Sequence, residues 1–154
     1  MRQCSWMLLL ALAVGLAGCE FGVSWDSSEK QNARHIFQSL AEARRAAGLA
    51  NELPRHWEPG GETVEPVLEA LDDALMHATQ VRNSVLTKAH PQLSVRFRTE
   101  YRPALRDLRE YFRSGEIDSE TDPRETLGEF TEWFYSNQHE FRWWRNHRRD
   151  LGLE

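Results

Sequence analysis

The sequence predicts an all-α protein whose mature part is a four-helix bundle, and three observations carry this prediction. Apolar residues recur at alternating steps of three and four in four separate stretches, which is the period of an amphipathic helix. Prolines, glycines and capping residues separate these stretches. No stretch alternates apolar and polar residues as a half-buried strand does. We expect up-down-up-down connectivity, although the long connection at 48–62 also allows a chain that crosses the bundle.

The N-terminal segment has the features of a secretory signal peptide. Arg2 precedes an apolar run at 7–16 that is too short for a permanent membrane-spanning helix. The sequence Leu-Ala-Gly-Cys that follows, at Leu16 to Cys19, resembles the lipobox of bacterial lipoproteins. The resemblance implies cleavage before Cys19, a diacylglycerol thioether on its sulfur and an acylated amino group. The alternative is an ordinary secretory signal that ends next to a cysteine.

The lipobox divides the chain into residues 1–18 as signal peptide, 19–26 as lipidated cysteine and tether, and 27–150 as one helical domain. Glu20 follows the cysteine, where many lipoproteins retained in the inner membrane have aspartate. The resemblance therefore implies a lipid anchor in the outer membrane, on its periplasmic side, in preference to the inner membrane. Two or more acyl chains give stable attachment, because each buried methylene adds about 0.8 kcal/mol.

Composition limits the partners and the covalent chemistry. Once Arg2 is removed with the signal peptide, 18 of the 19 Lys and Arg remain against 24 Asp and Glu, a net charge of −6 that argues against a nucleic acid partner. Cys4 is also removed and Cys19 is lipidated, so no cysteine pair remains for a disulfide. Packing must therefore hold the domain together.

The first two predicted helices have clear boundaries. The first starts at a capping box, Asp26 to Glu29, and ends at Gly48. Before it, the aromatic residues of the tether either lie at the lipid interface or cap the bundle. The second helix starts near Thr63 and carries an unbroken apolar stripe, formed by Val64, Val67, Leu71, Ala74, Ala78, Val81 and Val85.

The third and fourth predicted helices are marked by proline. His90 precedes Pro91 and ends the second helix, because the residue before proline is driven out of the helical region. Within the third helix, Pro103 predicts a kink or a restart. The fourth helix begins with Asp122 as cap and Pro123 in the first position.

The fourth helix is predicted to continue into the aromatic C-terminal region. Its core stripe includes Phe134, Phe141 and Trp144. Asn137 falls on the same stripe, where a polar residue commonly fixes the register of a bundle.

The sequence predicts no enzyme, cofactor or metal. Nucleophile elbows, phosphate-binding glycine loops and haem-attachment motifs are absent from it. Ferritin-like bundles need carboxylates and Glu-x-x-His pairs on their core faces, and the core stripes carry none. His35, His77 and His139 lie away from these stripes, so we predict surface histidines.

Two arginine-rich surfaces are candidate interaction sites. The first is a stripe along the third predicted helix, formed by Arg98, Arg102, Arg106, Arg109 and Arg113. Its arginines are solvated, paired with another helix, or available to a partner. The second lies near the C-terminus, where Trp143 points away from the predicted core stripe beside Arg145, Arg148 and Arg149. A tryptophan there suits an interface, a membrane surface or a contact with a loop.

The leading functional hypothesis is a lipid-anchored interaction module, which acts as an assembly factor, adaptor or inhibitor on an envelope protein partner. Small helical lipoproteins that pilot secretins are similar in size, anchor and helical class, without a shared residue motif. The alternative is a bundle that binds a small ligand or a metal, because small alanines face large aromatics and leave a cavity.

Charge predicts an orientation for an up-down bundle. The end beside the anchor has ten basic and seven acidic residues, a net charge of +3, which leaves −9 at the other end. We expect the basic end, with Trp143, Arg145, Arg148 and Arg149, to face anionic headgroups or a membrane-proximal partner. The acidic end is then available to recruit a basic partner.

Overall fold

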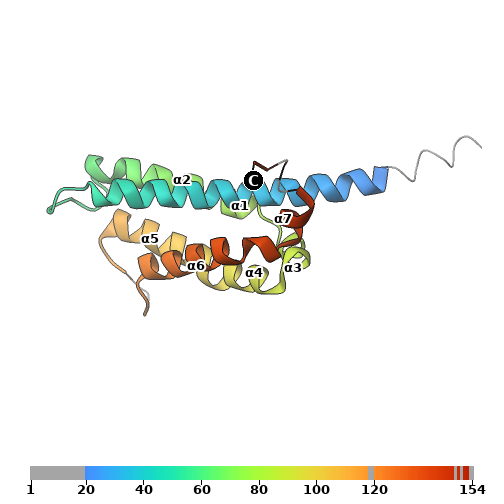
Figure 1. The fold of residues 1–154 in the computed structure, drawn as a ribbon. Coiled ribbons are helices and arrows are strands. Elements are labelled where there is room, and N and C mark those ends of the chain that lie inside the picture. The colour runs from blue at the N-terminus through green and yellow to red at the C-terminus, as the bar shows by residue number, and fades with distance from the viewer. Residues whose placement is uncertain (1–19, 118–119, 148, 150, 153–154) are drawn as a thin grey trace, which may run out of the picture.

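The computed structural model describes residues 20–117, 120–147, 149 and 151–152. Within these ranges every element of regular secondary structure is a helix, so the prediction of an all-α protein is confirmed. Two long layers of helices lie one above the other, with the C-terminal helix α7 joining them near one end (Figure 1). None of the described helices combines the length and the apolar character that crossing a membrane requires. The signal peptide and Cys19 lie outside the described residues.

Helix α1 (Glu20–Asn51) is the longest element and packs along α2 (Glu65–Gln80). The short helix η1 (Glu62–Val64) precedes α2. Helix α1 starts at Glu20 and includes both the residues predicted as a tether and the predicted capping box, so the predicted start at Asp26 is wrong. The helix also continues through Gly48, since one interior glycine costs only about 1 kcal/mol relative to alanine.

The second predicted helix is interrupted, so the prediction of an unbroken helix is wrong. Helix α2 ends at Gln80, Val81 and Arg82 are extended, and α3 (Asn83–Ala89) follows. Two side chains from other helices supply the hydrogen bonds that a continuous helix would have made. Asn32 Oδ1 accepts from the amide of Arg82 at 2.5 Å, and the Arg102 guanidinium donates to the carbonyls of Ala78 and Val81.

The third predicted helix consists of α4 (Pro91–Arg96), the π-helical segment η2 (Phe97–Tyr101) and α5 (Arg102–Ser114). Its start after an extended His90 confirms the predicted boundary. The predicted irregularity before Pro103 is also confirmed. The amide of Arg102 bonds to the carbonyl of Phe97, five residues back, because Pro103 has no amide with which to continue the α-helical ladder.

Helix α6 (Pro123–Asn137) begins at the predicted cap, where Asp122 Oδ1 accepts from the amide of Arg124 at 2.9 Å. It ends at Asn137, whose side chain donates to the carbonyl of Trp133. Asn137 is therefore a terminating residue, and its predicted role as a buried register residue is wrong. Helix η3 (Gln138–Glu140) and helix α7 (Arg142–His147) follow.

The core lies between the two layers and is rich in aromatic rings. Tyr101 stacks on Phe97 and meets Phe130 at a centroid distance of 4.7 Å, and Phe134 and Phe141 continue the cluster towards α7. Helix α2 packs on α5, and α5 packs on α6. Alanines occupy the α1–α2 contact, which lets the two helices lie close together, namely Ala33, Ala70, Ala74 and Ala78.

Candidate functional site

A groove of about 810 Å³ runs between the C-terminal half of α1 and the helices α5 and α6. Leu40, Leu108 and Leu127 form its apolar base, and alanines of α1 form one wall. The opposite wall and the closed end are largely aromatic, with Trp57, Tyr111, Phe112 and Tyr135. The volume of the groove is typical of binding sites for small molecules and short segments.

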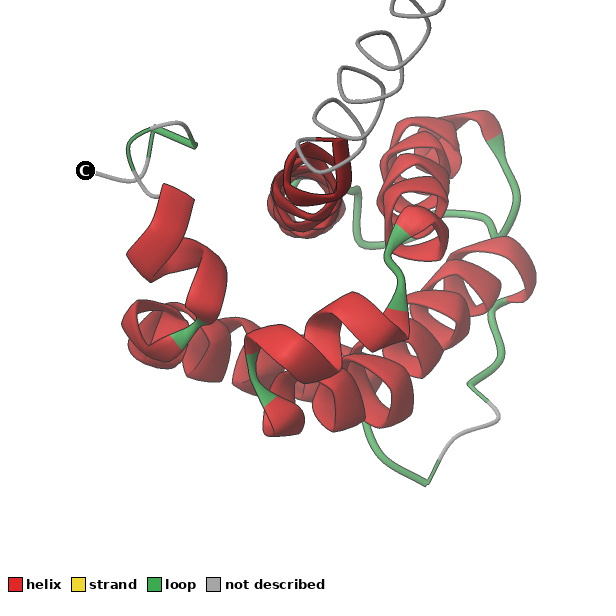
Figure 2. Cartoon of the chain, turned by 90° about the vertical axis from the view of Figure 1, so that its right-hand side faces the viewer, coloured by secondary structure: helices red, strands yellow, loops and turns green. Residues whose placement is uncertain are grey.

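The small size of the α1 side chains that line the groove accounts for its open space. At one point α1 and α6 are joined through Phe37 and Phe134, whose rings meet edge to face at 5.4 Å. Further along α1 the side chains that face α6 are small, with Ala43, Ala47 and Ala50. Alanine side chains leave space that larger side chains would fill, so the groove remains open. Figure 2 shows the helix backbones in a view along the long axis of the fold.

The connection between α1 and α2 closes the far end of the groove. Trp57 packs edge to face on Tyr111 at 5.4 Å and also contacts Phe112 at 5.3 Å. The amide of Gly60 donates to the carbonyl of Phe112 at 3.0 Å, which ties this connection to the end of α5. Trp57 is thus held in place by packing and by a backbone hydrogen bond near it.

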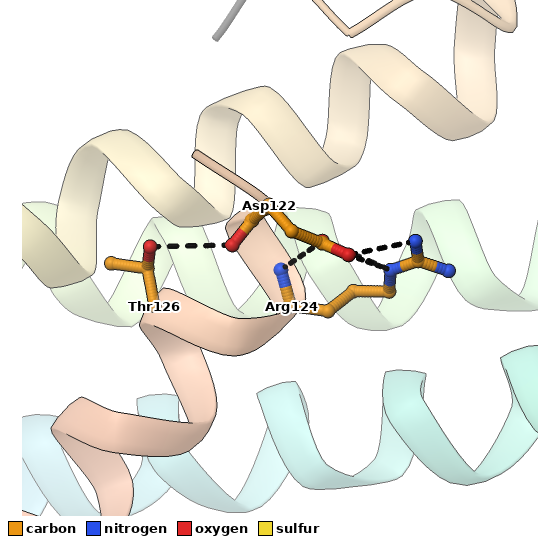
Figure 3. A network of polar contacts seen from close by, with 3 residues as sticks. All are labelled: Asp122, Arg124 and Thr126. Atoms are coloured by element: carbon orange, nitrogen blue, oxygen red, sulfur yellow. Dashed lines mark hydrogen bonds and ion pairs between the residues drawn. The ribbon is translucent and has the colours of Figure 1, made fainter. Parts of the chain in front are cut away.

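Charged side chains line the rim of the groove. Arg124 is fixed by Asp122, with Nε 3.0 Å from Oδ1 and Nη2 2.9 Å from Oδ2, and its guanidinium lies 5.8 Å from the centre of the Tyr111 ring (Figure 3 shows the Asp122 contacts). The hydrogen bonds from the Arg124 side chain, and then from its amide, hold the pKa of Asp122 below its usual value. Arg44 and Glu132 add one positive and one negative group.

The predicted arginine stripe divides between structural and exposed positions. Arg102 donates to carbonyls at the end of α2, and Arg109 forms a bidentate ion pair with Asp72 of α2. These two arginines therefore pair with another helix, which is one of the three alternatives that the sequence leaves open. Arg98, Arg106 and Arg113 are exposed, so only three of the five arginines in the predicted stripe form a surface.

The predicted C-terminal surface is reorganised. Trp143 is fully buried, at 0% exposure, and packs on Phe141, so its predicted direction away from the core is wrong. The reason is that α6 ends at Asn137, and the turn before α7 changes which residues face the core. Arg145 and Arg149 are exposed, and Arg148 lies outside the described residues.

Two of the three histidines expected on the surface face each other. His35 of α1 and His77 of α2 are half-buried, and their Nδ1 atoms are 3.3 Å apart. Burial, and then the neighbouring His77, lower the pKa of His35, which favours the neutral ring. His139 is exposed, as predicted. The described residues include no group of three or more His, Cys, Asp or Glu arranged to hold a metal.

Comparison with known proteins does not assign the chain to a family. No family model matches the chain, and the searches of curated proteins and of solved structures found no match.

Proposed function

We propose that the protein is a lipid-anchored interaction module that holds a helical segment of an envelope protein partner in the groove between α1, α5 and α6. The proposal includes an outer-membrane anchor at Cys19 on the periplasmic side, and an up-down four-helix arrangement left open between its first and last helices. The observation that carries it is the alanine wall of α1 opposite aromatic side chains in an unfilled groove.

The shape of the groove favours a helix as its occupant. Ala43, Ala47 and Ala50 are spaced by four and three residues, so they lie on one face of α1 and allow a close approach of another helix. The lining from Leu40 to Asn51 extends over about 16 Å of helix, or roughly three turns. A partner helix presents apolar anchors over the same length at positions i, i+3 or i+4, and i+7.

The lining also has the chemistry of a protein interface. Tyrosine, tryptophan and arginine supply much of the binding energy at such interfaces, and the groove combines Trp57, Tyr111 and Arg124. Tyr135 at the rim is 45% exposed, so its large ring is in contact with water when no partner is bound. Arg44 and Arg124 favour acidic side chains beside the apolar stripe of the partner.

The anchor and the groove are connected by a single helix. Because α1 already includes Glu20, the residue after the proposed lipidated cysteine, an extended tether between the lipid and the helix is not needed. About twenty residues of helix lie between Glu20 and Leu40, which corresponds to about 30 Å. An α1 that stands upright on the membrane would hold the groove at that distance from the lipid.

Two matched substitutions test the groove. Ala47→Trp fills it with a large ring at an exposed position of α1, whereas Met76→Trp adds a ring to the exposed surface of α2, outside the groove. Crosslinking and purification of the native protein should recover one stoichiometric envelope partner with the parent and with Met76→Trp, and much less with Ala47→Trp. Equal recovery by both variants would contradict the groove assignment, and no partner with the parent would contradict the function.

The anchor requires a separate test. Cys19→Ser removes the proposed lipidation site, so the variant should leave the membrane fraction while its far-ultraviolet circular dichroism remains helical. Retention of Cys19→Ser in the membrane fraction would contradict lipidation at this residue.

A second candidate function is the binding of a small apolar ligand, which the volume of the groove favours, since sites for such ligands span roughly 300–1,000 Å³. Native mass spectrometry of protein purified from its own host separates the two candidates. A bound organic molecule that Ala47→Trp displaces would support the ligand. A mass that equals the acylated polypeptide alone would remove it.

A further inference from the structure

We propose that His35 of α1 and His77 of α2 form a two-histidine site for a zinc ion, which links α1 to α2. The proposal is independent of the groove, because neither histidine belongs to the groove lining. It rests on the distance between two ring nitrogens, on their access to solvent and on the rigidity of the helices that hold them.

The two imidazole rings point towards each other across the α1–α2 contact. Their Nδ1 atoms are 3.3 Å apart, their centroids are 5.6 Å apart and their planes are inclined by 34°. Two nitrogens that each lie about 2.0–2.1 Å from a tetrahedral zinc are separated by about 3.3–3.4 Å. The observed separation therefore equals the distance that a tetrahedral ion requires between two of its ligands.

The same distance discriminates against square-planar ions. Adjacent ligands of a square-planar ion subtend 90°, which brings nitrogens at about 2.0–2.1 Å from the metal to about 2.8–3.0 Å from each other. The pair at 3.3 Å would have to contract for that geometry. For zinc, each ring rotates so that its Nδ1 lone pair points at the ion instead of at the other nitrogen.

The proton balance of zinc binding is simple. Without a metal, one neutral ring donates its Nδ1–H to the Nδ1 lone pair of the other ring. When zinc binds, the donating ring changes to the tautomer protonated at Nε2, so both Nδ1 atoms coordinate and the neutral pair releases no proton. Water completes the tetrahedral shell, because both histidines are half-buried and remain accessible from solvent.

The helices hold the pair in place before any ion binds. One turn further along α1, Ser39 Oγ donates to the carbonyl of Ala74 on α2 at 2.7 Å, which fixes the two helices relative to each other. Ser39 follows His35 by four residues and Ala74 precedes His77 by three, so this bond lies next to the pair. A preorganised pair loses little conformational freedom when it binds the metal.

The experiment is a calorimetric titration of zinc chloride into the full-length chain, purified in detergent. We expect one ion per chain, with affinity reduced at least about tenfold by His35→Ala and by His77→Ala, since each removes one of two protein ligands. His56→Ala and His139→Ala remove exposed histidines elsewhere and should leave the affinity unchanged. Added zinc should raise the melting temperature of the parent and of these two controls.

Two outcomes would overturn the proposal. Failure of the parent to bind zinc would show that the pair is only a hydrogen bond between two rings. Binding that survives both His35→Ala and His77→Ala would belong to other ligands, such as the thiols of the unprocessed chain. Circular dichroism verifies the fold of each variant, and His35→Gln, which keeps a polar group of similar size, replaces His35→Ala if that variant does not fold.

Discussion

The carboxylate of Glu29 on α1 and the guanidinium of Arg142 on α7 form an ion pair with Nε 3.0 Å from Oε1. Only 4% of the Glu29 side chain is exposed, whereas half of Arg142 remains in water. A carboxylate that is removed from water requires compensation, and Arg142 supplies it from the opposite end of the chain. This ion pair thus helps to hold the C-terminal helix against α1.

Removal of this cation should therefore destabilise the fold. We expect Arg142→Gln to lower the free energy of unfolding by about 1–3 kcal/mol, because it removes a cation that lies 3.0 Å from a buried carboxylate. Arg145→Gln on the same helix removes an exposed arginine and should change it by no more than about 0.5 kcal/mol. Urea unfolding of both variants measures the difference. Equal effects would show that Arg142 contributes no more than surface charge.

A second prediction concerns the interruption between α2 and α3. The Arg102 guanidinium contacts the carbonyl of Ala78 at 2.6 and 3.1 Å and that of Val81 at 2.8 Å. Arg102→Met keeps most of the apolar stem and removes all three contacts, which should cost about 1–3 kcal/mol. Arg102→Lys should recover only part of this, because one ammonium group does not reproduce the planar fork.

Arg106→Met, at an exposed position of α5, is the matched control for Arg102→Met. Hydrogen exchange should show faster opening at residues 78–82 in Arg102→Met and unchanged opening in Arg106→Met. Unchanged exchange in both variants would mean that the interruption does not depend on Arg102.

The contrast between these elements explains how much of the fold was predictable. The start of α6 was predicted because Asp122, Pro123 and Arg124 are adjacent in sequence, and a helix cap is a local structure. The end of α2 was not predicted because Asn32 and Arg102, which stabilise it, are far from it in sequence. Apolar periodicity alone continued through the interruption.

The same distinction applies to the candidate sites. The small alanines and the possibility of a cavity were visible in the sequence, but the distance between α1 and α6 is set by tertiary packing. The burial of Trp143 depends on the end of α6 at Asn137, which changes the direction in which the following side chains point. His35 and His77 each resemble a surface residue until α1 and α2 are paired.

A third prediction concerns the hydroxyl groups buried at the centre of the core. Ser39 Oγ donates its single proton to the carbonyl of Ala74. The Tyr101 hydroxyl must therefore donate to Ser39 Oγ, at a distance of 2.9 Å. Ser39→Ala removes the acceptor of the buried tyrosine hydroxyl and one hydrogen bond to the carbonyl of Ala74, and it should cost about 1–3 kcal/mol. The double variant Ser39→Ala/Tyr101→Phe should lose less than the sum of the two single variants, as measured by urea unfolding.

Burial also raises the pKa of Tyr101 above its ordinary value. A raised pKa in the folded state stabilises the protein below the unfolded pKa of about 10, and this contribution is lost as the pH rises above it. In a spectrophotometric titration, Tyr101 should ionise only as the protein unfolds. Ionisation of Tyr101 with the fold intact would contradict its burial.

The last prediction separates the stability of the fold from the function of the groove. Gly128 lies in the middle of α6 and lines the groove, and no atom lies within 4 Å of the position that a Cβ would occupy. Gly128→Ala should stabilise the protein by about 0.5–1 kcal/mol, because alanine loses less backbone entropy in a helix. Gly48→Ala on α1 has equally open space but lies outside the lining, so it should give a similar gain.

A larger side chain at the same two positions should distinguish them. Gly128→Leu projects into the groove and should reduce recovery of the partner, whereas Gly48→Leu should leave recovery unchanged, while both variants melt no lower than the parent. Gly115→Ala provides the opposite control, because Gly115 has φ +82° and a Cβ there would lie 2.8 Å from Cγ of Pro59, so it should destabilise the protein. Thermal unfolding and partner recovery, measured on the same preparations, test both effects. Loss of partner with Gly48→Leu as well as Gly128→Leu would show that binding depends on α1 and α6 generally and not on the groove between them.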